Sequence, residues 1–146
     1  MNKEYVEQKC NNDCIVCSKN NPASLQTRFF TVSDGEVEGR FTGRDIHASY
    51  KGRMHGGIIA AVLDETMART LFTQDPDGLC VTATMTVNYN KPVPLGVPLK
   101  SMGKMVFQNE KKFEAYSELI LPDGTVAADA TGVYVLRSKE QVKPIK

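Results

Sequence analysis

Residues 55–72 read HGGIIAAVLDETMARTLF, and this stretch decides the fold. From Gly57 to about Phe72 the apolar density is too high for a surface helix, while the run is too short to cross a membrane. The pattern predicts one helix, buried along most of its circumference, that stops at the Asp75-Pro76-Asp77-Gly78 turn. A single apolar helix needs cover on most sides, and one antiparallel sheet curling around it would supply that cover.

The segments on both sides of this helix show the alternation and the β-branched residues typical of strands. Strands are predicted over residues 28–33, 36–42, 80–90, 99–108, 113–121 and 125–136. Asp34-Gly35 and Pro122-Asp123-Gly124 are turn signals, and residues 91–98 form a proline-punctuated connection. The sequence therefore predicts one α+β domain over residues 28–137. An irregular or weakly helical segment with a cysteine cluster (1–27) precedes it, and a basic tail (138–146) follows it.

Composition narrows the function classes. The 146 residues are 41% hydrophobic and 24% charged, and the formal net charge is +1. A general nucleic-acid binder would be strongly basic, so no nucleic acid is expected as a partner. The polar stretch from Met1 to Gln8 has no signal-peptide core, and no apolar run approaches membrane length. A cytoplasmic protein with no membrane partner is expected.

The four cysteines are Cys10, Cys14, Cys17 and Cys80. The C-x-x-x-C-x-x-C spacing of the first three is also found in radical-SAM enzymes, but the repeated βα units of such enzymes are missing from this sequence. A structural zinc site would need a fourth ligand, for which Cys80, His47 and His55 are the candidates. Reduced cysteines in a turn-rich segment are the favoured interpretation, with no metal and no cofactor.

Asp64 is the main candidate for chemistry. Burying a carboxylate in an apolar helix costs free energy, so it usually serves a partner, a metal or a reaction. Its neighbours three and four residues away are small or flexible, as a pocket wall requires: Ala60, Ala61, Met67 and Ala68. The alternative is an acid satisfied by threonine hydroxyls. Gly56 lies where the helix begins, and its free N–H can stabilise a developing negative charge. Together they indicate hydrolysis at a carbonyl.

Gly56 and Asp64 cannot easily serve one carbonyl from the same helix. Eight residues of helix separate them by about 12 Å, and a carboxylate side chain reaches only a few ångströms. Two such helices running antiparallel across a dimer axis would bring Gly56 of one chain near Asp64 of the other. The expectation is an obligate homodimer with two equivalent composite sites.

Other polar residues have two interpretations each. His55 either braces the turn or contacts the substrate carbonyl. Thr82 shares one strand face with Thr84 and Thr86, where it could orient a water for Asp64 or reflect β-propensity alone. Glu65 has Arg69 as an i, i+4 charge partner, and the alternative is a part in the site.

Residues 52–67, GRMHGGIIAAVLDETM, resemble the signature of hotdog-fold acyl-CoA thioesterases, in particular the phenylacetate-degradation type. Two further segments agree: Val87-Asn88-Tyr89-Asn90-Lys91-Pro92, and Cys14-Ile15-Val16-Cys17 followed by Asn21-Pro22-Ala23-Ser24-Leu25, where Ser24 replaces the usual glycine. The resemblance runs from about Cys14 to Leu136. It implies a hotdog fold, an antiparallel sheet wrapped around a central helix, in a homodimer that is often a dimer of dimers.

The resemblance also implies roles. Asp64 falls at the position of the catalytic carboxylate, Gly56 at that of the oxyanion N–H, His55 near the same oxygen, and Thr82 where the attacking water is held. Ser49 stands where better-characterised members have an asparagine. The candidate substrate-binding residues are Ser49, Gly57, Glu65, Met67, Tyr89 and Lys91.

The expected substrate is an acyl-CoA, and the expected reaction is hydrolysis of its thioester by a carboxylate nucleophile or general base. Candidate cations for the coenzyme phosphates are Lys91 and then Arg53, Lys104, Arg137 and Lys139. Three alternatives remain: a non-catalytic acyl-CoA or lipid-binding hotdog protein, a hotdog dehydratase or hydratase, and a metal-binding module built on Cys10, Cys14 and Cys17. The sequence does not identify the acyl group or distinguish coenzyme A from acyl carrier protein.

Overall fold

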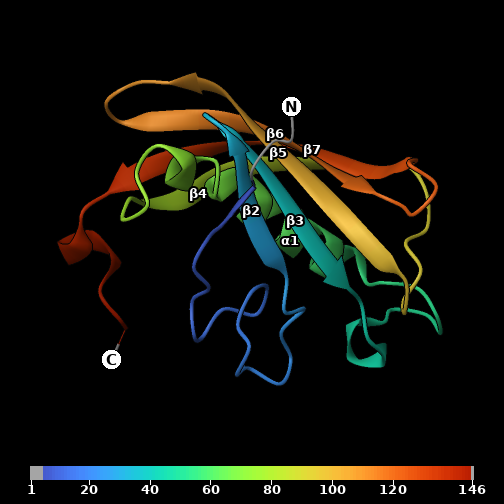
Figure 1. Ribbon diagram of the computed structural model, residues 1–146. Helices are drawn as coiled ribbons and strands as arrows, with labels where there is room; N and C mark the ends of the chain where they lie inside the picture. The colour runs from blue at the N-terminus through green and yellow to red at the C-terminus, as the bar shows by residue number, and fades with distance from the viewer. Residues whose placement is uncertain (1–4, 146) are drawn as a thin grey trace.

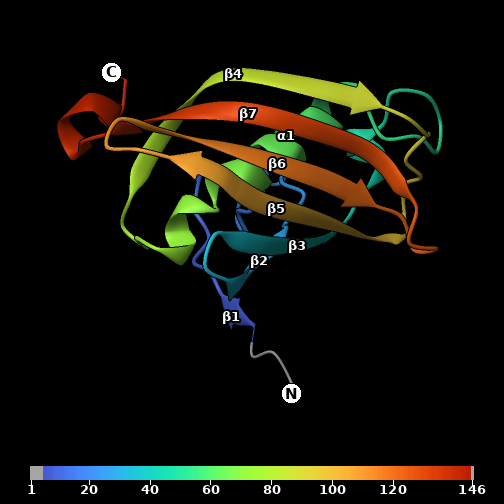
Figure 2. The same cartoon turned by 90° about the horizontal axis from the view of Figure 1, so that it is seen from above.

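Seven antiparallel strands form one sheet in the order β1-β2-β3-β5-β6-β7-β4, and the sheet curves around helix α1 (Figures 1 and 2). The computed structural model describes residues 5–145. The strands are β1 (Val6–Glu7), β2 (Arg28–Ser33), β3 (Glu36–Thr42), β4 (Leu79–Tyr89), β5 (Pro98–Gln108), β6 (Lys112–Ile120) and β7 (Val126–Arg137). Helix α1 spans Gly56–Ala68, and short 3₁₀ turns are η1 (Asp45–His47), η2 (Leu71–Thr73) and η3 (Lys139–Val142). The α+β hotdog architecture expected from the sequence is confirmed.

Sheet order differs from chain order at one strand, β4. It follows the helix in sequence but lies at the far edge of the sheet, where it pairs only with β7 (Figure 2). Its register aligns Thr82 with Tyr134, and the ladder shifts between Thr82 and Thr84. No strand of residues 5–145 pairs with the other edge of β4.

Helix α1 packs its apolar side on β3 to β7 and supplies the centre of the core. Val62, Leu63 and Met67 are fully buried. A glycine allows the closest approach, because a Cβ at Gly103 on β5 would lie 2.8 Å from the main-chain oxygen of Thr66. The Thr66 hydroxyl donates to the Val62 carbonyl (2.6 Å) and lies 2.8 Å from the Ser101 hydroxyl. These contacts fix the height of the helix over the sheet.

Some predicted boundaries were wrong. The helix ends at Ala68 rather than near Phe72, because Arg69 is the C-cap and the chain tightens into η2. The segment expected to be irregular contains β1, whose Val6 and Glu7 pair with Thr31 and Phe30. The tail contains η3. Residues 1–4 and 146 of the two predicted terminal segments lie outside the described residues. In the described part of the chain, no helix has the length and apolar character needed to span a membrane.

Candidate functional site

The Asp64 carboxylate is half-buried between helix α1, the edge strand β4 and its neighbour β7. The Thr82 hydroxyl donates to Asp64 Oδ1 at 2.8 Å. The Tyr134 hydroxyl lies 2.8 Å from the same Oδ1 and 3.1 Å from the main-chain oxygen of Asp64. Among residues 5–145, Oδ2 receives no hydrogen bond. One oxygen of the carboxylate is therefore fixed by two hydroxyl donors, while the other is free to react.

Tyr134 is a member of this set that sequence reasoning missed. It is fully buried, and its ring stacks on Phe113 with centroids 5.1 Å apart. Burial raises the pKa of Tyr134 well above its usual range, and the nearby Asp64 charge raises it further. The phenol therefore remains a proton donor at neutral pH. The sequence gives only a weak signal for this role, because a tyrosine in a strand 70 residues from Asp64 is interpreted as a core residue.

The start of helix α1 presents one free donor. His55 is the N-cap residue, and its Nδ1 accepts from the Gly57 N–H at 2.8 Å, a contact that braces the turn. The N–H groups of Ile58 and Ile59 bond to the His55 carbonyl. Within the described residues the Gly56 N–H has no acceptor. The cap thus uses Gly57 and leaves Gly56 available.

A cavity of about 380 Å³ opens beside Gly56. Of the predicted site residues it is lined by Ser49, Gly56, Tyr89 and Lys91, together with Arg53. The Tyr89 hydroxyl donates to the Gly56 carbonyl at 2.8 Å, which ties the end of β4 to the start of the helix. Two cations, Arg53 and Lys91, therefore lie around the same opening as the free N–H.

Other candidates lie elsewhere. Glu65 contacts Cys14 and Arg69 on the side of α1 facing the N-terminal segment. Met67 is fully buried in the core. Among the candidate cations, Lys104 lies 3.9 Å from Glu36, and Arg137 and Lys139 line a separate cavity of about 450 Å³. His47 is buried with Nδ1 accepting from the Arg44 N–H and Nε2 against the Ala23 carbonyl, so it serves the loop.

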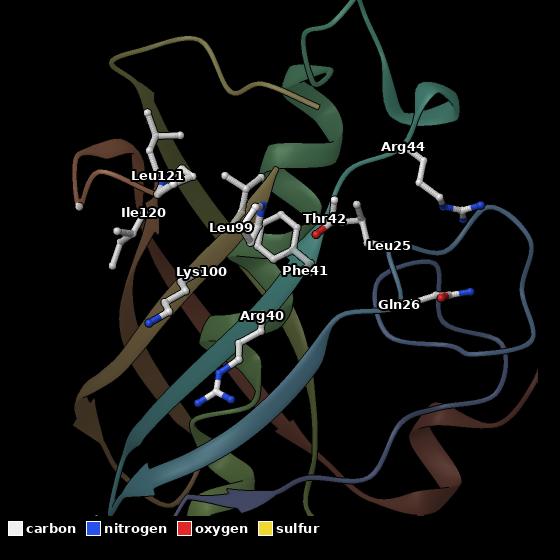
Figure 3. A pocket seen from close by; sticks show the side chains of 13 residues that line it. Leu25, Gln26, Arg40, Phe41, Thr42, Arg44, Leu99, Lys100, Ile120 and Leu121 are labelled. Carbon is white, nitrogen blue, oxygen red and sulfur yellow. The ribbon is translucent and has the colours of Figure 1, made fainter. Parts of the chain in front are cut away.

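Another cavity, of about 840 Å³, contains none of the predicted site residues. Figure 3 shows its wall, where Phe41 of β3 and Leu99 of β5 are paired neighbours and Arg40, Arg44 and Lys100 lie around them. This cavity belongs to the β3–β5 part of the sheet, away from Asp64 and Gly56.

The two halves of the candidate site lie along one helix. Thr82 and Asp64 mark one half, and Tyr89 and Gly56 mark the other, because β4 runs beside α1 in the opposite direction. Eight residues of helix put about 12 Å between them. The protomer therefore offers an oriented carboxylate and a free N–H that do not face one another.

The profile of the thioesterase superfamily matches residues 51–128, just over half of the chain. The acyl-coenzyme A thioesterase THEM4 of Rattus norvegicus is 24% identical over 108 residues, which cover 73% of this chain and 46% of that protein. The chain thus spans less than half the length of this relative.

Solved structures share the fold. A thioesterase superfamily protein is 26% identical, with a TM-score of 0.76 over 85% of this chain and 60% of the other. A putative thioesterase described as phenylacetic acid degradation-related, from Ralstonia eutropha JMP134, is 22% identical (TM-score 0.69, 80% and 93% covered). A hypothetical thioesterase from Streptococcus pneumoniae TIGR4, solved with coenzyme A, is 21% identical (TM-score 0.67, 73% and 81% covered). With its helix, its sheet and the match over residues 51–128, this chain belongs to the thioesterase superfamily.

Proposed function

We propose that this protein hydrolyses an acyl-CoA thioester to the free acid and the coenzyme thiol. The observation that carries the proposal is the Asp64 carboxylate, with Oδ1 held by Thr82 and Tyr134 and Oδ2 unengaged within the described protomer. Such a group can attack a carbonyl carbon or take a proton from water. The THEM4 relative, which is described as an acyl-coenzyme A thioesterase, supports this substrate class.

The reaction needs few other groups. Attack on the thioester carbonyl makes an oxyanion, which the free N–H of Gly56 can stabilise by a hydrogen bond worth about 3 kcal/mol in the transition state. When the tetrahedral intermediate collapses, the C–S bond breaks and the sulfur leaves as a thiolate that takes up a proton, so a strong general acid is not required. Attack by water gives the free acid directly, whereas attack by Asp64 gives an anhydride that water must then hydrolyse. Thr82 and Tyr134 are positioning residues that hold Oδ1 of Asp64 and so orient Oδ2.

The cavity beside Gly56 suits the coenzyme end of the substrate. Lys91 and Arg53 line it and offer positive charge to phosphates. Ser49, Tyr89 and Gly57 lie at or next to this opening and complete the proposed binding surface. The Streptococcus structure solved with coenzyme A supports a coenzyme-binding role for a protein of this fold.

We further propose that the working unit is a homodimer in which the partner's Gly56 faces Asp64. The free edge of β4 supports this, because an 11-residue edge strand with unpaired main-chain groups is a template for pairing with a second copy. If two β4 strands pair antiparallel about an axis near Met85 and Thr86, Tyr89 of one chain lies opposite Thr82 of the other. Within each chain Tyr89 bonds to Gly56 and Thr82 bonds to Asp64. That register would therefore bring Gly56 of one chain close to Asp64 of the other.

A thiol-release assay on a panel of acyl-CoA thioesters, short aliphatic to aryl, tests the activity. We expect turnover by the wild type and loss of turnover in Asp64→Asn, with Asp123→Asn, a matched change in an exposed turn, as the control. Equilibrium binding of acyl-CoA without thiol release would instead identify a non-catalytic binder. Full turnover by Asp64→Asn would also reject the proposal, and sedimentation showing a fully active monomer would reject the dimeric site.

A further inference from the structure

The N-terminal segment and helix α1 meet at a cluster of two thiols, a carboxylate and a guanidinium. The Sγ atoms of Cys14 and Cys17 and a carboxylate oxygen of Glu65 all lie within 4.8 Å of one another. Cys14 Sγ is 3.4 Å from Glu65 Oε1 and 3.3 Å from Oε2. The mechanism proposed for Asp64 uses none of these groups, so the cluster needs an explanation of its own.

The sulfur atoms accept an unusual number of hydrogen bonds. Cys17 Sγ accepts from the Asn11 N–H at 3.3 Å and from Arg69 Nη2 at 3.0 Å. Cys14 Sγ accepts from the Val16 N–H at 3.3 Å. The thiols also donate, Cys14 to the Glu65 carboxylate and Cys17 to the Asn11 carbonyl at 4.0 Å. A bound metal would replace these protons, and the three N–H donors would then stabilise the thiolates.

Charge balance then calls for a cation. Once a metal has replaced the thiol protons, the two thiolates and the Glu65 carboxylate would carry three negative charges, while Arg69 contributes one positive charge through its 3.2 Å ion pair with Glu65. Cys17 and Arg69 are buried, with exposures of 0% and 4%, and uncompensated charge is costly there. One divalent cation makes the cluster neutral.

The spacing fits a particular ion. A tetrahedral zinc ion about 2.3 Å from a sulfur and about 2.0 Å from an oxygen holds those atoms about 3.5 Å apart, close to the observed separations of Cys14 Sγ from Glu65. Thiolates also select zinc over magnesium or calcium. We therefore propose that Cys14, Cys17 and Glu65 bind one zinc ion, with water as the fourth ligand.

A disulfide between Cys14 and Cys17 fits the surroundings less well. Disulfide sulfurs have no proton to donate, so both Glu65 oxygens would face an atom that offers them nothing. The zinc site also differs from the metal module considered from the sequence. Cys10 is exposed and lies outside the cluster found in residues 5–145, His47 and His55 serve their loops, and Glu65 supplies the third ligand.

Zinc at this position would clamp the N-terminal segment onto α1. Arg69 already reaches that segment through the Lys9 carbonyl at 3.0 Å and the side chain of Gln8 at 3.3 Å. The ion would add bonds from Cys14 and Cys17 to the same helix. We expect zinc to raise the thermal unfolding midpoint and to slow proteolysis between residues 9 and 25, without any requirement for turnover.

The test uses the full-length protein, freed of metal by chelation under reducing conditions. Competition with a chromophoric chelator should show one zinc bound per chain, and Co²⁺ should give sulfur-to-cobalt charge-transfer absorption. Cys17→Ser and Glu65→Gln should weaken zinc binding by more than about 100-fold, since even changes around a metal's ligands cost 10–100-fold. Cys10→Ser and Cys80→Ser are the matched controls and should bind as the wild type does.

Circular dichroism checks that each variant is folded, and Glu65→Gln, which preserves side-chain shape, covers the case in which Cys17→Ser unfolds. The proposal is overturned if the folded wild type binds no more zinc than Glu65→Gln. It is also overturned if protein purified without reductant shows the mass loss of two hydrogens and a Cys14–Cys17 disulfide in place of the ion.

Discussion

Replacing Gly56 by proline removes one N–H from the start of helix α1 and little else. Proline is favoured at the first helical position, and His55 already has φ −63° and ψ 138°, the extended conformation that a residue before proline adopts. The His55 cap on the Gly57 N–H stays in place. The added Cβ lies 3.4 Å from Tyr89 Cε1, and Tyr89 is 54% exposed, so its ring has room to shift.

The magnitude follows from the role proposed for this N–H. Loss of one oxyanion donor costs about 100- to 1,000-fold in kcat, or about 2.7–4 kcal/mol, while KM changes little because the donor acts mainly in the transition state. Thiol release measured over a range of acyl-CoA concentrations gives both constants. Gly56→Ala adds the same Cβ but keeps the N–H, so it should retain a kcat near that of the wild type. A Gly56→Pro variant with wild-type kcat would refute the reasoning, as would equal losses in both variants.

Mixing two inactive variants then tests whether the site is shared. In a composite site, a heterodimer of Asp64→Asn and Gly56→Pro has one site with both defects and one intact site. Random exchange of equal amounts makes about half of the dimers mixed, so about a quarter of wild-type activity should return. If activity stays at the level of the separate variants after exchange, Gly56 and Asp64 do not act across an interface.

Three further predictions rest on single contacts. Tyr134→Phe keeps the ring stack on Phe113 but removes the hydroxyl that bonds to Asp64. The free energy of unfolding in guanidinium should therefore fall by about 1.5–3 kcal/mol, and kcat should fall more than KM changes. An unchanged kcat would contradict the positioning role. Gly103→Ala places a Cβ 2.8 Å from the Thr66 carbonyl oxygen and should destabilise the fold by about 1–3 kcal/mol in urea; wild-type stability would contradict this close approach. Burial raises the pKa of Cys80 to about 11, so at pH 9 about 1% of this thiol is ionised, against half of a thiol with pKa 9.0. Alkylation of Cys80 by iodoacetamide at pH 9, followed by mass spectrometry, should therefore be about 50-fold slower than that of an unstructured peptide containing Cys80, and equal rates would contradict the burial.

Local sequence signals predicted most of the fold. The hairpin turn at Asp34-Gly35 and the turn at Pro122-Asp123-Gly124 set strand boundaries to within a residue or two, since turn chemistry acts on neighbouring residues. The end of α1 was misplaced by four residues because Arg69 to Phe72 continue the apolar pattern while the main chain tightens into η2. Helical periodicity cannot distinguish an α-turn from a 3₁₀ turn.

The candidate site could be predicted only for reactive residues that lie close together in the sequence. Asp64, His55 and Gly56 stand together in one helix, and their spacing in the sequence already showed that one protomer separates them. Tyr134 and the partnership of Glu65 with Cys14 depend on contacts between residues 70 and 51 positions apart. Only the fold brings such residues together. The sequence around a single strand tyrosine or helix glutamate does not indicate its distant partner.

The position of β4 has a consequence for how the protein is made. A ribosome releases β4 well before β7, yet β7 is its pairing partner among the described strands and also provides Tyr134. Until β7 emerges, β4 lacks its pairing partner, and Asp64 on α1 lacks one of its two hydroxyl partners. The candidate site is therefore complete only after β7 has been synthesised. A chain that stalls before residue 134 has an incomplete, aggregation-prone sheet, which is a substrate for chaperones or proteases.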